Sequence, residues 1–261
     1  MKIHRFGIPV TWDEKEKQIV AERGISVQSR SEKRFGEMEN LVYEPGNAPR
    51  DEVCYVFFQN IWEEDKEAAF TERKVTNGIT VLSGGTMGME CRKNSGHYHG
   101  LNPGHTLPYP EAYEVLWGQA VFLLQKSGNF EQEDFVVEDL EAVFVNEGEK
   151  LVVPPFCGHC VANVGEGSMA FGNLAVPCPL HYEPIKKKHG FAVYVLKVDG
   201  RVVFVPNENY GKVPRLRVSK AKERPDLGLV KGKALYTSYT ERPERFEYLW
   251  EPEKYRSALE R

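Results

Sequence analysis

The sequence predicts an all-β protein, a β-sandwich or small barrel built from many short strands. From residue 79 onward, short apolar or alternating runs recur between Gly, Pro and Asn residues. The chain contains 23 Gly and 16 Pro, which suits frequent turns between such strands. No helical segments alternate with the runs, and this argues against a doubly wound sheet.

The individual strands follow from these runs. The first expected strand, residues 53–61, precedes the strand-rich region and is dense in aromatic and β-branched side chains. An Asp-Gly pair, Asp199-Gly200, separates the last two runs and predicts a hairpin turn. The expected strands are 53–61, 79–82, 111–117, 120–125, 135–137, 150–153, 160–163, 169–174, 191–198 and 202–205.

Changes in composition divide the chain into three parts. Residues 1–75 are polar and mixed in charge, and we expect an N-terminal extension that packs on the barrel. Residues 76–206 are the expected barrel domain. Residues 207–261 are rich in Lys, Arg and Glu and are interrupted by prolines, with apolar residues at roughly helical spacing. We therefore expect short helices in the extensions, and a C-terminal arm that packs on its own barrel or on a second subunit.

Charge and cysteine content exclude several classes of partner. The chain has 34 Lys and Arg against 38 Asp and Glu, a net charge of −4 and a pI near 6.0, so nothing favours nucleic acid or an anionic membrane. No apolar run approaches the roughly 20 residues of a membrane helix, and the first residues lack a secretory apolar core. Five Cys are too few and too scattered for a disulfide framework. The sequence predicts a cytoplasmic protein.

Two histidines, His97 and His99, are candidate metal ligands. Side chains two apart on a strand share a face, so the two imidazoles converge as metal ligands do. The alternative is that the pair binds no metal, with one histidine buried and the other exposed. On the next expected strand, Glu111 and Tyr113 share one face and Glu114 lies on the other, so only one of the two acids joins the histidines.

These residues belong to a longer pattern that resembles the two sequence motifs of the cupins. The matching residues are His97-x-His99, Glu111-x6-Gly118 and Gly148-x5-Pro154-x-Phe156-x2-His159-x3-Asn163. The spacing match selects Glu111 over Glu114. The chain departs from the pattern in a long spacer, residues 100–110, which contains His105, and in Phe156, where cupins have Gly.

The cupin resemblance implies a jelly-roll fold and a metal site. The implied ligands are His97, His99, Glu111 and His159. Three imidazoles and a carboxylate suit a borderline divalent ion, and an octahedral ion would keep two positions open for substrate or water. We expect one divalent transition metal per subunit, Fe²⁺ first, with Mn²⁺, Ni²⁺, Zn²⁺ or Co²⁺ as alternatives. Because cupins include oxygenases, isomerases and binding proteins, the motif predicts the fold better than the reaction.

Residues 78–206 resemble, more closely, the cupin-type glucose-6-phosphate isomerases known mainly from archaea. The matching residues are Thr80-Val81-Leu82, Gly85, Gly88, Glu90, Gly96-His97-Tyr98-His99, Glu111-Ala112-Tyr113, Val153-Pro154-Pro155, His159, Asn163, His181 and Lys188-His189-Gly190-Phe191. The resemblance implies a homodimer of glycolysis and gluconeogenesis that interconverts glucose 6-phosphate and fructose 6-phosphate.

The same resemblance implies which residues surround the sugar phosphate. They are Thr80, Gly96, Tyr113 and His181. Asn94 stands where the family has Thr, and Val176 where it has Tyr, so the phosphate side differs from the family. Lys188 ends a cationic run, residues 186–188, that is either a solvated loop or a phosphate contact near the barrel mouth.

The expected reaction moves one hydrogen between C1 and C2 of the sugar. A metal would polarise O1 and O2, and Glu111 is the candidate base of an enediol path, with a hydride shift as the alternative. Tyr113 is either a hydrogen-bond donor to a sugar hydroxyl or a core residue. The rival functions are an iron cupin dioxygenase and a non-catalytic sugar-binding cupin. An apolar, closed mouth would favour the dioxygenase, whereas a mouth lined by Thr80, Tyr113, His181 and Lys188 would favour a sugar phosphate.

One further motif, Cys157-Gly158-His159-Cys160, is also found in disulfide isomerases. There it opens a helix whose N-terminus lowers the thiol pKa. Here Pro154-Pro155 precede it and Val161 follows, which predicts a turn into a strand. We therefore interpret the two cysteines as structural.

Overall fold

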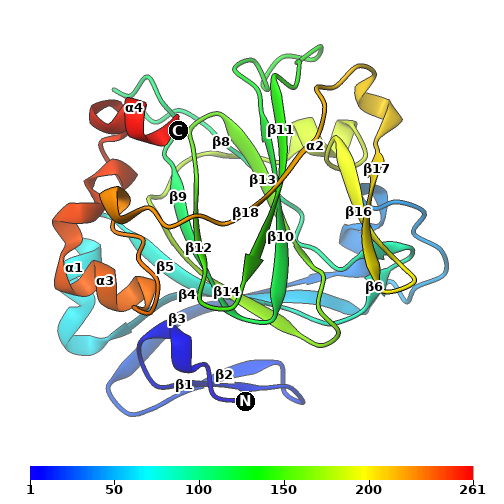
Figure 1. Cartoon of the computed structure of the whole chain (residues 1–261). Helices are drawn as coiled ribbons and strands as arrows, with labels where there is room; N and C mark the ends of the chain where they lie inside the picture. The colour runs from blue at the N-terminus through cyan, green and yellow to red at the C-terminus, as the bar shows by residue number, and fades with distance from the viewer. Residues whose placement is uncertain (261) are drawn as a thin grey trace.

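A computed structural model of the chain describes residues 1–260 and confirms the all-β cupin jelly roll (Figure 1). Two sheets form the barrel, and every pair of neighbouring strands in them is antiparallel except β11 and β18. In sheet order, the first sheet contains β12 (Lys150–Val153), β9 (Glu111–Trp117), β14 (Met169–Ala175), β5 (Thr76–Leu82), β4 (Val53–Glu63) and β3 (Ile25–Arg34). The second contains β13 (Cys157–Asn163), β10 (Gln119–Lys126), β11 (Asp139–Asn146) and β18 (Arg217–Lys220).

Smaller elements surround the barrel. The remaining strands are β1 (Val10–Asp13), β2 (Gln18–Ala21), β6 (Thr86–Met87), β7 (Glu90–Cys91), β8 (Tyr98–His99), β15 (Leu180–His181), β16 (Val193–Val198) and β17 (Arg201–Pro206). The α-helices are α1 (Glu67–Thr71), α2 (Glu183–Lys187), α3 (Leu235–Glu241) and α4 (Arg256–Leu259). The 3-10 helices are η1 (His4–Phe6), η2 (Phe35–Glu37), η3 (Glu39–Leu41), η4 (Glu64–Lys66), η5 (Glu208–Tyr210), η6 (Pro225–Leu227), η7 (Pro243–Leu249) and η8 (Pro252–Tyr255). Among the described residues, no helix has the length and apolar character needed to span a bilayer.

The C-terminal segment covers the outer face of the six-stranded sheet. On β5, Ile79 and Val81 face outward and pack in one core cluster with Phe246 and Leu249 of the tail. Figure 1 shows α3 and α4 beside this sheet, on the side of the barrel away from β16 and β17. The tail therefore packs on its own barrel, and β5 is buried on both faces.

Strands β3 and β4 continue the six-stranded sheet beyond the boundary expected at residue 75. Phe57 of β4 lies opposite Thr80 of β5 on one side and opposite Ser31 of β3 on the other. The N-terminal part of the chain thereby adds its own side chains to the inner face of the barrel sheet.

One expected strand, residues 135–137, is wrong. This segment is a loop in which Phe135 and Val137 are buried in a core cluster with Tyr98. The strand begins two residues later, at Asp139, and pairs along its whole length with β10. Buried apolar residues in this loop therefore gave the same sequence pattern as a short strand.

Candidate metal centre and cavity

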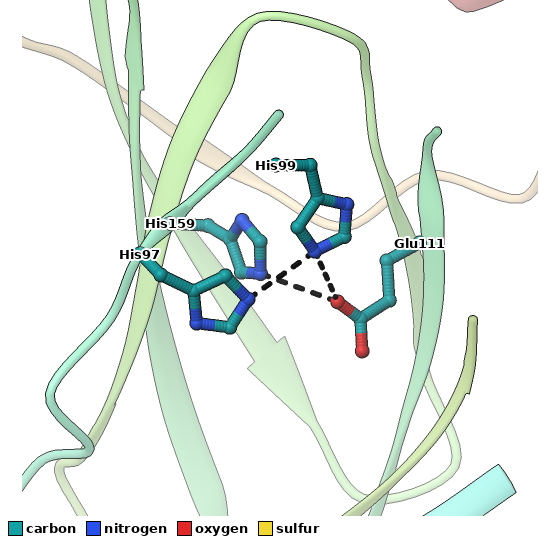
Figure 2. A group of neighbouring side chains, drawn as sticks. All are labelled: His97, His99, Glu111 and His159. Atoms are coloured by element: carbon teal, nitrogen blue, oxygen red, sulfur yellow. Dashed lines mark hydrogen bonds and ion pairs between the residues drawn. The ribbon is translucent and has the colours of Figure 1, made fainter. Parts of the chain in front are cut away.

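Four side chains that the sequence places in three separate segments converge in the structure. Figure 2 shows His97, His99, Glu111 and His159 pointing toward one another, and their ligand atoms all lie within 4.8 Å. His97 Nε2 lies 3.2 Å from His99 Nε2. Glu111 Oε2 lies 3.2 Å from His99 Nε2 and 3.4 Å from His159 Nε2. The predicted ligand residues are thus brought together, and His105 lies outside the cluster.

The backbone sets two of these histidines face to face. His97 N–H donates to His159 O over 3.2 Å, and His159 N–H donates to His97 O over 3.0 Å, at the edge of β13. Side chains directly opposite in such a pair lie on the same face. The preceding Gly96 has φ +68°, and a Cβ there would lie 2.4 Å from the Phe191 ring and 2.6 Å from His159 O. Only glycine permits this close approach.

The outer ring nitrogens of two histidines are held by backbone carbonyls. His99 Nδ1 lies 2.7 Å from Tyr109 O, and His159 Nδ1 lies 3.2 Å from Cys157 O. Because a carbonyl only accepts, each Nδ1 carries the proton when the ring is neutral. Each Nε2 then presents its lone pair to the cluster, which is the usual support of metal-binding histidines.

Burial and mutual proximity shift the protonation of the cluster. Burial holds the pKa of His97 well below its ordinary value, and the neighbouring His159 and His99 add to this. Burial alone would raise the pKa of Glu111, but its contacts with His159 and His99 hold it well below the usual range. Burial also opposes protonation of His99, yet Cys178 and Glu111 raise its pKa to about 10. The contacts within the cluster therefore keep Glu111 as a carboxylate anion.

A cavity of about 470 Å³ opens beside the cluster, along the inner face of the six-stranded sheet. Of the predicted substrate residues, Thr80, Asn94, Gly96 and Tyr113 line it. Tyr113 Oη lies 3.0 Å from His159 Nε2, and burial together with Glu111 raises the pKa of this phenol well above its ordinary value. Asn94 Oδ1 accepts a hydrogen bond of 2.7 Å from Val161 N, which ties the segment before His97 to β13.

Two predicted substrate residues, His181 and Lys188, do not line this cavity. His181 lies opposite Tyr98 across β15 and β8, and Tyr98 points away from the face of His99. The His181 ring instead packs on Phe130. Lys188 Nζ donates to Asn209 O over 3.2 Å. The residues after and before His181 take its place, since Tyr182 and Leu180 both line the cavity.

Lys33 and Asn173 are among the cavity residues that sequence reasoning missed. Lys33 is the only Lys or Arg that lines the cavity among the described residues. Asn173 Nδ2 donates to Glu111 Oε1 over 2.7 Å. Neither residue falls in a motif, and both are placed by strand register, so a reliable pairing of β3 with β4 and of β14 with β9 would have been needed to find them.

Comparison with known proteins identifies the family. A family model described as glucose-6-phosphate isomerase (GPI) matches residues 32–213. The glucose-6-phosphate isomerase of Pyrococcus furiosus is 27% identical over 163 residues, which is 62% of this chain and 75% of that protein.

Solved structures with local similarity include an oxalate oxidase in complex with glycolate and the vicilin of hazelnut, Corylus avellana. The oxalate oxidase is 14% identical with a TM-score of 0.31 over 59% of this chain, and the match spans about half of its own length, 51%. The vicilin is 8% identical with a TM-score of 0.34, over 51% of this chain and 31% of its own.

The family match covers both metal motifs and every residue named above as lining the cavity, Lys33 included. We conclude that the chain belongs to the glucose-6-phosphate isomerase family and is an isomerase built on a cupin barrel.

Proposed function

We propose that this protein interconverts glucose 6-phosphate and fructose 6-phosphate in a reaction that depends on a divalent metal. The observation that carries the proposal is a cluster of three histidines and Glu111 beside a cavity, in a chain of the glucose-6-phosphate isomerase family. The cavity volume of about 470 Å³ is within the usual range for small-molecule sites.

The residues present fit a borderline divalent ion. They offer three imidazole nitrogens, two of which are aimed by backbone carbonyls, and one carboxylate oxygen. His97, His99, Glu111 and His159 would hold the ion, and Fe²⁺ is the one we expect. When bound, such an ion supplies Lewis acidity to the oxygens on C1 and C2 of the sugar.

Glu111 and Tyr113 are the candidate catalytic residues. Glu111 is a buried carboxylate on the cavity wall, so in an enediol path it would take the proton from C2 and return it to C1. Tyr113 shares the inner face of β9 with Glu111 and keeps its proton. Its hydroxyl would therefore donate a hydrogen bond to a sugar oxygen beside His159.

Lys33 is proposed to recognise the phosphate, in place of Lys188. Lys33 of β3 and Glu111 of β9 line the same cavity from strands at opposite sides of β14, β5 and β4. A positive charge on the cavity wall away from the histidine cluster suits the phosphate end of the substrate. The nearby Glu32 is neutralised by Arg30 and Arg34, and Lys33 itself is paired with Glu37 at 2.9 Å in an exposed contact that phosphate could replace.

The test is an assay of chelator-stripped protein reloaded in turn with Fe²⁺, Mn²⁺, Co²⁺, Ni²⁺ and Zn²⁺. Conversion of fructose 6-phosphate to glucose 6-phosphate should appear on reloading and vanish on stripping. Oxygen uptake is recorded in parallel. Metal-loaded protein that binds the sugar phosphate without turnover would instead support a binding cupin, and substrate-dependent oxygen uptake would support a dioxygenase.

A further inference from the structure

Asn173 contacts the carboxylate of Glu111 from a neighbouring strand. It lies on β14 opposite Tyr113 of β9, so Glu111, two residues earlier on β9, is its diagonal neighbour on the same face. Asn173 Nδ2 donates to Glu111 Oε1 over 2.7 Å. This contact is independent of the cupin motifs, which contain no residue of β14.

The contact divides the two oxygens of Glu111 between two tasks. Oε2 faces His99 and His159 at 3.2 and 3.4 Å, whereas Oε1 is held by the amide. The last torsion of a glutamate side chain is otherwise broad, because an sp³–sp² bond has no sharp rotamer. A donor on one oxygen therefore fixes the rotation of the carboxylate, so that the other oxygen faces the histidines.

The amide oxygen of Asn173, Oδ1, contributes no hydrogen bond within residues 1–260 that would explain an Asn at this position by folding alone. This oxygen is buried and has no hydrogen-bond partner among the described residues. The amide also needs Gly78 opposite it, because a Cβ at Gly78 would lie 2.9 Å from Oδ1. Turning the amide over would set Oδ1 against the Glu111 anion. An unsatisfied buried acceptor is unfavourable, so the useful half of this side chain is the donor to Glu111.

We propose that Asn173 is a positioning residue that holds Glu111 with Oε2 toward the three histidines. The inference rests on the proposed metal-dependent function. A neutral amide suits this role because it orients the carboxylate and leaves its negative charge for a cation, whereas Lys or Arg would neutralise it. Asn173 itself supplies no ligand atom to the cluster.

The test compares wild-type protein with N173L, which keeps the branching at Cγ and removes the donor. The matched control is Q59L, which removes another amide from the same cavity and the same row of the sheet, since Gln59 and Asn173 both lie opposite Gly78. Each protein is stripped and titrated with Co²⁺ against a competing chelator, and the visible absorption of bound Co²⁺ is recorded. KM and kcat for fructose 6-phosphate are measured on the loaded proteins.

We expect N173L to bind Co²⁺ about 10- to 100-fold more weakly, with an altered Co²⁺ spectrum and a lower kcat. Q59L should keep the affinity and the spectrum of the wild type. Wild-type affinity and spectrum in N173L, or an equal loss in Q59L, would overturn the inference. If N173L fails to fold by circular dichroism, N173A decides by the same measurements. A wild-type protein that binds Co²⁺ but turns over no sugar phosphate would refute the proposed function, while the comparison of affinities still decides the role of Asn173.

Discussion

His99 Nδ1 lies 2.7 Å from the backbone oxygen of Tyr109, and this contact links the cluster to the long spacer between the two halves of the first motif. Tyr109 is fixed in turn, because its Oη lies 2.8 Å from His105 Nε2. His105 Nδ1 lies 3.2 Å from Glu253 in the C-terminal tail. The insertion and the tail thus brace a residue of the cluster from outside the barrel.

The first prediction concerns the histidines. Replacing His97, His99 or His159 by Ala should each remove most of the bound metal and the activity, because each takes one of four ligands from the cluster. His105→Ala should lose far less metal, since its ring supplies no ligand and reaches His99 only through Tyr109. Metal per subunit is measured by atomic absorption on folded protein. Loss of metal in His105→Ala with retention in His159→Ala would show that the ligand set is wrong.

A second prediction concerns the brace at Glu253. This carboxylate accepts hydrogen bonds from the backbone N–H of Thr106 at 2.8 Å and of Leu107 at 3.1 Å. Burial opposes the charge, but these bonds and His105 lower the pKa of Glu253 from 4.5 to about 2. Because the folded pKa lies below the unfolded one, the stabilisation is present above pH 4.5 and is lost as the pH falls toward 2.

Glu253→Gln should therefore lower the free energy of unfolding by about 1 kcal/mol at pH 7, a discounted figure because the side chain is one-third exposed. The difference from the wild type should shrink between pH 4.5 and pH 2. Urea unfolding at a series of pH values measures this difference. A difference that stays constant down to pH 2 would mean that the charge of Glu253 contributes nothing.

Strands with a strong local signal could be predicted, and strands stabilised only by partners could not. Residues 111–117 and 150–153 form β9 and β12 with the predicted bounds, and the Asp199-Gly200 turn has φ values of 49° and 74°. β3 escaped prediction because most of its side chains are exposed or half-buried and many are charged. Its pairing with β4 forms the strand, and that information is not local.

The site divides in the same way. The four cluster residues lie in motifs with fixed spacing, so the sequence predicts that they converge. Phe156 adopts φ +61°, the left-handed conformation for which cupins use Gly at this position, so the departure changes the residue and not the backbone. The assignment of His181 to the cavity failed because one residue of register decides which face a side chain takes. Lys33 entered the cavity by the same long-range register.

A third prediction concerns Cys157 and Cys160. Both thiols are buried in β13, and burial raises the pKa of both, to about 12 for Cys160, so neither is ionised at neutral pH. The double variant Cys157→Ser with Cys160→Ser should keep metal content and turnover, with a stability loss of about 1–3 kcal/mol from the buried hydroxyls. Turnover and thermal unfolding are measured on the same sample. A collapse of turnover in folded protein would revive the redox interpretation.

The last prediction separates the two lysines proposed for phosphate recognition. Lys33→Ala should raise KM for fructose 6-phosphate about tenfold, the effect of losing roughly 1.5 kcal/mol of a charge-assisted hydrogen bond. It should leave KM for fructose unchanged, because that sugar carries no anion.

Lys188→Ala is the matched control and should alter KM for neither sugar, since the Lys188 Nζ is held by Asn209 O outside the cavity. Steady-state kinetics on both sugars at several salt concentrations measure this, and the difference between the sugars should diminish as salt rises. An equal rise of KM for fructose and fructose 6-phosphate in Lys33→Ala would show that Lys33 shapes the cavity without binding the phosphate. A rise of KM confined to Lys188→Ala would assign phosphate binding to the cationic run, residues 186–188.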